Sequence, residues 1–127
     1  MSRRYLSLSE AESALNRGKV IECFLGTCER EGKQGIKWLS ICSLGDAFEV
    51  SIYETADLGD EAFLDLYGFG PLNPDLELED PDRQEQFEDF QSLIQFLERH
   101  FEGASQRLVN EMVIQDEYSD FIARGRT

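Results

Sequence analysis

The chain has 127 residues, a formal net charge of −14 and a hydrophobic content of 41%. This length suits one domain with one core, and the apolar content excludes a wholly disordered chain. No apolar run reaches the roughly 18 residues of a membrane span, and the first residues lack the apolar stretch of a secretory signal peptide. We therefore expect a single domain over residues 1–127 that stays in the cytoplasm.

The first predicted element is a helix with Ser9 as its N-cap. Ser9 and Glu12 have the spacing of a capping box, in which each side chain satisfies a backbone N–H of the other residue. Ala14 and Leu15 contribute to a short apolar stripe. Gly18 stands where a glycine commonly ends a helix, so the helix is expected to stop there.

Three strands are predicted next, over residues 20–25, 36–43 and 47–53. The connections between them contain glycine, as hairpin loops commonly do. In the third strand, alternation places three apolar side chains on one face: Phe48, Val50 and Ile52. The pattern predicts an antiparallel three-stranded meander.

The second half of the chain begins with an irregular segment. Glycine and proline recur between residues 54 and 83. Residues 62–67 fit a helical turn or a short strand, and residues 76–79 suggest a short edge strand. From residue 84 to 101 a helix is predicted, because apolar residues recur at helical spacing: Phe87, Phe90, Leu93, Ile94, Leu97 and Phe101. Residues 105–123 fit either a helix or a segment that includes a short strand.

These elements predict an α+β fold. It consists of an N-terminal helix, a three-stranded antiparallel meander, a long acidic irregular segment and C-terminal helices packed on the sheet. We expect the helix at 84–101 to cover one face and the first helix to pack at one end. Residues 55–80 would cover the other face or one edge.

The negative charge is concentrated in one part of the chain. Residues 54–89 contain thirteen acids and a single base, Arg83, whereas residues 1–53 contain seven of each. Such a segment repels nucleic acids and anionic membranes, and it attracts basic protein surfaces. The alternative interpretations are a solvated surface that only maintains solubility, or a calcium loop, but the glycine and glutamate spacing of an EF-hand is missing.

Aromatic residues interrupt the acidic segment. We expect Phe63 and Trp38 to belong to the core, while Tyr67 and Phe69, which neighbour glycines, are candidate contact anchors. The predicted partner-binding residues combine these two aromatics with the surrounding acids: Asp57, Asp60, Glu61, Asp65, Tyr67, Phe69, Asp75, Glu77, Glu79, Asp80 and Asp82.

The sequence carries no motif that indicates catalysis or a cofactor. His100 is the only histidine, and no P-loop, Rossmann glycine pattern or Gly-x-Ser-x-Gly is present. The chain has an odd number of cysteines: Cys23, Cys28 and Cys42. Free thiols are therefore expected, and a zinc site is not, because no Cys-x-x-Cys pair is present. We therefore expect no enzyme activity, no metal and no cofactor.

In length, acidity, order of elements and acidic aromatic runs such as 60–67, the chain resembles small immunity proteins of bacterial polymorphic toxin and contact-dependent growth inhibition systems. The resemblance implies a cytoplasmic inhibitor, monomeric or weakly dimeric. It would bind the C-terminal toxic domain of a cognate toxin, often a basic nuclease, and block its active site. No family site residue can be transferred, because the resemblance is one of type.

Two other classes of binding protein share the acidity. Secretion chaperones are small, acidic α+β proteins that bind an extended effector segment. DNA-mimic inhibitors place carboxylates at phosphate-like spacing across several elements, whereas here the acids are concentrated in one segment. A dimer-forming apolar helix face would favour the chaperone.

Overall fold

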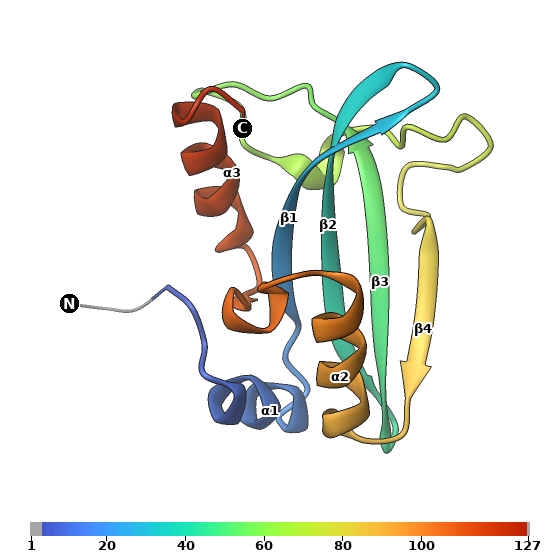
Figure 1. The fold of residues 1–127 in the computed structure, drawn as a ribbon, viewed down its shortest axis with the longest axis vertical. Coiled ribbons are helices and arrows are strands. Elements are labelled where there is room, and N and C mark those ends of the chain that lie inside the picture. The colour runs from blue at the N-terminus through green and yellow to red at the C-terminus, as the bar shows by residue number, and fades with distance from the viewer. Residues whose placement is uncertain (1–3, 127) are drawn as a thin grey trace.

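The computed structural model describes residues 4–126 and shows an α+β fold with one antiparallel sheet. The strands occur in the order β4-β3-β2-β1-β5 across the sheet (Figure 1). Their bounds are β1 Ile21–Arg30, β2 Lys33–Leu44, β3 Ala47–Ala56, β4 Arg83–Phe87 and β5 Val109–Asn110. The α-helices are α1 Leu8–Asn16, α2 Phe90–His100 and α3 Ile114–Ala123, with 3-10 turns η1 Leu66–Gly68 and η2 Ala104–Gln106.

The predicted meander forms the centre of the sheet, and it is longer than expected. The antiparallel pairing of β1 with β2 continues to Arg30 opposite Lys33, and that of β2 with β3 continues to Gly35 opposite Ala56. β4 then pairs with β3, and β5 with β1. The three-stranded prediction is therefore extended to five strands.

One face of the sheet packs against α1 and α2. Phe48, Val50 and Ile52 lie on this face, as predicted, and Val50 is fully buried. Leu15 of α1 and Leu97 of α2 are fully buried in the same cluster. Figure 1 shows α2 across this face and α1 at the lower end of the sheet.

The opposite face is covered by α3 together with part of the acidic segment. Phe24, Ile36 and Trp38 point to this side and pack with Phe121 of α3 and Leu66 of η1. A β-bulge between Phe24 and Gly26 changes the register of β1 at this point. The two C-terminal helices thus lie on different faces, because α2 belongs to the first cluster and α3 to the second.

The predicted helix at 84–101 is wrong in its first third. Residues 83–87 form β4, and α2 begins only at Phe90. Phe87 is the cross-strand partner of Phe48 and packs in that position. The helix α2 begins after Asp89, whose carboxylate caps it by accepting a hydrogen bond from the Ser92 N–H at 2.7 Å. Residues 83–87 therefore pair with the edge of β3, although the spacing of Phe87 from the later apolar residues fits a helix.

Two smaller predictions are also wrong, and one open alternative is decided. The N-cap of α1 is Ser7, two residues before the predicted Ser9, and the capping box is closed by Glu10. Residues 76–79 form turns and no strand, so the edge strand is β4. Residues 105–123, left open above, contain both the short strand β5 and the helix α3.

Candidate functional site

The acidic segment forms two loops, which lie on opposite sides of the sheet at the end where the β1–β2 hairpin turns. We call residues 57–65 the first acidic loop and residues 73–82 the second acidic loop. Between them the chain returns to β3, where the Ala56 N–H donates to the Gly70 carbonyl at 2.8 Å and the Leu72 N–H donates to the Glu54 carbonyl at 3.0 Å. Figure 1 shows the first loop in green beside α3 and the second in yellow beside β4. The expected single acidic surface is therefore two surfaces.

Seven of the predicted acids are exposed. Asp60, Glu61 and Asp65 are exposed in the first loop, and four more are exposed in the second: Asp75, Glu77, Glu79 and Asp80. No lysine or arginine occurs between residues 57 and 82. Both loops therefore present uncompensated negative charge.

Asp57 and Asp82 are less exposed than the other predicted acids and accept hydrogen bonds within the fold. The Asp57 carboxylate is 9% exposed, and its Oδ1 accepts from Arg126 Nη1 at 2.5 Å and from the Tyr118 hydroxyl. Asp82 Oδ1 accepts from the Glu54 N–H at 2.7 Å, and burial raises the pKa of this carboxyl. Both side chains hold the loops in place instead of offering free charge.

The two predicted aromatic anchors are not exposed contact residues. Phe69 is 1% exposed, with ring centroids 5.5 Å from Tyr118 and 5.4 Å from Phe63, so its interpretation as an exposed anchor is wrong. Its ring fills the space between α3 and the sheet. Tyr67 is half-buried, and its hydroxyl donates to Glu22 Oε1 at 2.7 Å. Trp38 is buried, as predicted.

The exposed apolar side chains in the first acidic loop are Leu58 and Phe63. Leu58 is 63% exposed and Phe63 is 47% exposed, whereas Phe63 was expected in the core. Asp60 and Phe63 exchange backbone hydrogen bonds of 3.1 and 2.9 Å, and the Ala62 N–H donates to Asp60 Oδ1 at 2.8 Å. These bonds define a tight turn, so the loop has a fixed shape.

The base of this loop is held by residues from the end of the chain. The Gly59 N–H donates to the Tyr118 hydroxyl at 2.9 Å, and Arg126 Nη2 donates to the Gly59 carbonyl at 2.7 Å. A Cβ on Gly59 would lie 2.5 Å from both the Phe63 carbonyl oxygen and the Tyr118 ring. Only glycine fits this space. The neighbouring sequence gave no indication that residue 59 must be glycine.

A buried carboxylate joins η1 to the sheet. Glu22 of β1 is 2% exposed, and its Oε1 accepts from the Tyr67 hydroxyl and from the Met112 N–H, the latter at 3.0 Å. Burial raises the pKa of Glu22, although both hydrogen bonds act in the opposite direction. A single glutamate in an otherwise apolar strand gave little indication of this role.

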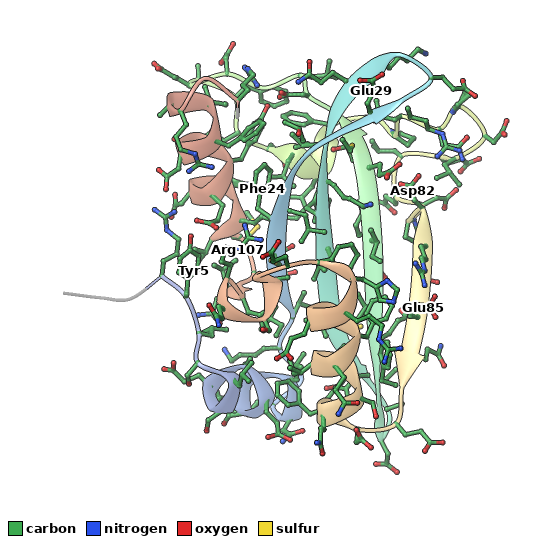
Figure 2. All side chains as sticks on the ribbon, in the orientation of Figure 1. Tyr5, Phe24, Glu29, Asp82, Glu85 and Arg107 are labelled. Carbon is green, nitrogen blue, oxygen red and sulfur yellow. The ribbon has the colours of Figure 1, made fainter. Side chains whose placement is uncertain are left out.

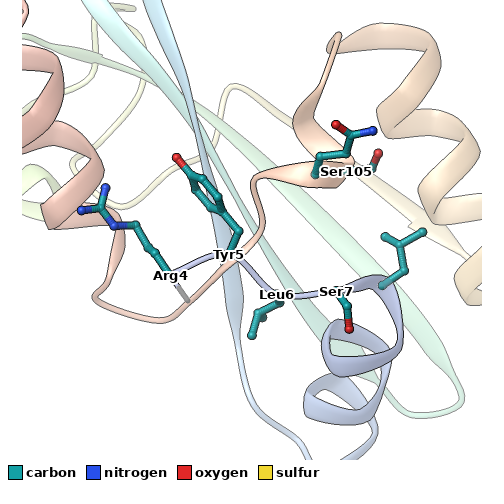
Figure 3. Close-up of a pocket in the computed structure, with 7 residues that line it drawn as sticks. Arg4, Tyr5, Leu6, Ser7 and Ser105 are labelled. Atoms are coloured by element: carbon teal, nitrogen blue, oxygen red, sulfur yellow. The ribbon is translucent and has the colours of Figure 1, made fainter. Parts of the chain in front are cut away.

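A hollow lies away from the acidic loops, near the first residues that the structure describes. This hollow lies between residues 4–8 and the turn at 105–106 (Figure 3) and has a volume of about 660 Å³, but its charged residue, Arg4, is already paired with Glu117 and Asp120. Within residues 4–126, no group of three or more metal-ligating side chains is positioned to hold an ion. Over the same residues, no helix has the length and apolarity needed to cross a membrane.

The three cysteines are free thiols. Burial raises the pKa of Cys23 to about 12 and that of Cys28 to about 11, so both are protonated at neutral pH.

Comparison with protein-family models found no match for this chain, and comparisons with curated proteins and with solved structures found none either.

Proposed function

We propose that this chain is a cytoplasmic immunity protein that binds the toxic domain of a cognate toxin and neutralises it by covering its basic active-site surface. The observation that carries the proposal is the placement of seven exposed acids in two loops at the same end of the molecule. The exposed Leu58 and Phe63 supply apolar contact area within the first of these loops. Binding, not catalysis, is the activity that this arrangement favours.

Both loops flank the β1–β2 hairpin at the upper end of the sheet in Figure 1. Figure 2 shows Glu29 on this hairpin, between the two loops. The hairpin itself is balanced, because Glu29 and Glu31 are accompanied by Arg30 and Lys33. The net negative charge of this end therefore comes from the loops, and it would orient a basic partner before contact.

The acids are expected to act together and not singly. An exposed ion pair contributes only about 0–1 kcal/mol. Their combined field acts over the Debye length of about 8 Å at physiological salt and accelerates encounter with a basic surface. A DNA mimic is less favoured, because the exposed acids of this end occupy two irregular loops and no extended, regularly spaced surface.

The proposal is tested with the toxin domain that a neighbouring gene would encode. That domain is expressed in bacterial cells with and without this chain, and growth is measured together with complex formation by size-exclusion chromatography. Growth restored by co-expression, with a complex of the two chains, supports the proposal. Cells that remain inhibited, or two chains that elute separately, would contradict it.

A further inference from the structure

We propose that Leu58 and Phe63 form the apolar anchor by which the first acidic loop enters a pocket of its partner, and that Arg126 and Tyr118 hold this anchor in its binding shape. The inference rests on the proposed function, since it names the part of the surface that the toxin domain would contact. The partner that fits is a protein domain with an apolar pocket rimmed by lysine or arginine.

Exposure alone does not identify Leu58, because single exposed apolar residues are common on protein surfaces. What distinguishes Leu58 is that both neighbours along the chain are fixed from a distance. Asp57 is bound by Arg126 and Tyr118, and Gly59 is bound by the same two residues through its N–H and carbonyl groups. The Leu58 side chain therefore projects from a backbone with little freedom to fold it inward.

Phe63 is supported in a different way. Its ring lies edge-to-face on Phe69, which in turn lies edge-to-face on Tyr118. Its backbone is paired with Asp60 in both directions. A side chain already ordered in this manner loses little conformational entropy when a partner covers it, which is the property of a strong contact residue.

Two other exposed leucines, Leu78 and Leu44, do not have this support. Leu78 is 52% exposed in the second acidic loop, where the hydrogen bonds nearest to it are local, such as that from the Asp80 N–H to the Glu77 carbonyl, and the link to β3 lies farther along the chain at Asp82. Leu44 is 49% exposed next to the β2–β3 turn, at the far end of the meander from the acidic loops. These two residues provide matched controls for Leu58.

The chemistry of the partner follows from the surroundings of the anchor. Asp60, Glu61 and Asp65 are exposed around it, and the loop contains no base. An apolar pocket with a basic rim would bury Leu58 and Phe63 and place cations opposite these carboxylates. The second acidic loop, whose link to β3 lies at Asp82 and not beside Leu78, would contribute mainly to long-range attraction.

We call the hydrogen bonds from Arg126 and Tyr118 to Asp57 and Gly59 the clamp. It can be tested without any partner by amide hydrogen exchange. In Arg126→Gln and Tyr118→Phe, we expect the Gly59 and Phe63 amides to exchange about tenfold faster or more, while core amides such as that of Ile41 keep their protection. Arg126→Lys, which retains the charge beside Asp57, should restore part of the protection of the Gly59 and Phe63 amides. Unchanged exchange at Gly59 in both variants would overturn the clamp.

The anchor is tested by binding the toxin domain encoded beside this gene, with Leu58→Ser and Phe63→Ser measured against Leu44→Ser and Leu78→Ser. We expect the first pair to weaken binding about tenfold or more through faster dissociation, and the control pair to have little effect. Equal affinities in all four variants would overturn the anchor while leaving the proposed function intact. Absence of binding by the unsubstituted chain would overturn the function and the anchor together, whereas the clamp depends only on the exchange result.

Discussion

The Glu22 carboxylate accepts a hydrogen bond from the Tyr67 hydroxyl at 2.7 Å, across 45 residues of sequence, in a site where Glu22 is only 2% exposed. The bond attaches η1, between the two acidic loops, to the central sheet. The Glu22 carboxyl group is buried, and burial disfavours its charged form. The pKa of Glu22 is therefore raised above its ordinary 4.5. This relationship makes the stability of the fold depend on pH.

We predict that Glu22→Gln becomes stabilising relative to the unsubstituted chain as pH rises. At pH values below 4.5 the carboxyl is protonated in both the folded and the unfolded state, so it imposes no penalty. Above 4.5 the unfolded chain ionises first, and stability falls until the pH passes the raised pKa of the folded state. Glutamine keeps an acceptor for Tyr67 and Met112 but does not ionise.

The measurement is urea denaturation of both proteins between about pH 4 and pH 8. The difference in unfolding free energy should change in favour of the variant across this range. Glu29→Gln, an exposed substitution on the same strand, is measured alongside as the control variant. A difference for Glu22→Gln that is constant with pH would show that Glu22 is not perturbed.

Substitution of the edge-to-face pair Phe63 and Phe69 should distinguish core packing from surface contact. Phe69→Ala removes a ring that is 1% exposed and should lower the free energy of unfolding by about 3–5 kcal/mol. Phe63→Ala removes a ring that is 47% exposed and should cost much less. Chemical denaturation of the two variants decides this, and comparable losses would mean that Phe63 belongs to the core after all.

Gly59 should be far less tolerant of substitution than Gly70. Alanine at 59 places a Cβ 2.5 Å from the Phe63 carbonyl oxygen, so the loop must shift, at a cost of about 1–3 kcal/mol. Alanine at 70 meets no atom within 4 Å, and Gly70 does not have a positive φ. We therefore expect Gly70→Ala to leave the melting temperature nearly unchanged, and equal effects at both positions would contradict the packing described for Gly59.

The role of the second acidic loop is separable by kinetics. Neutralising Asp75, Glu77, Glu79 and Asp80 to amides should reduce the association rate with the toxin domain about tenfold at low salt, with little change in dissociation. The matched control neutralises four exposed glutamates elsewhere: Glu12, Glu88, Glu98 and Glu102. If both sets slow association equally, only net charge matters and the loop has no particular role.

The central strands were predictable because their signal is local. Alternating apolar residues mark β3, and the face that carries Phe48, Val50 and Ile52 is buried as the pattern indicated. The α+β class follows from such local periods. The boundary near residue 84 was not predictable in this way, because Phe87 fits a helical stripe while its partner Phe48 lies 39 residues earlier.

The candidate site was predictable in composition but not in geometry. A run of acids with few bases must be largely exposed, and seven of the nine predicted acids are. Burial of Phe69, however, depends on Tyr118, and the fixed loop around Leu58 depends on Arg126 at the other end of the chain. Contacts between residues so far apart leave no periodic trace in the sequence.

The lengths of the strands have a consequence for aggregation. β1, β2 and β3 have ten, twelve and ten residues, while the outer strands β4 and β5 have only five and two. Long apolar strands are thus flanked by short ones, and β4 carries Arg83 and Glu85, a charged composition that discourages further pairing. A nascent chain that has not yet reached residue 83 would expose a ten-residue edge of β3. The short fourth strand therefore covers half of the β3 edge, from Phe48 to Ile52, which would otherwise be available for pairing with another chain.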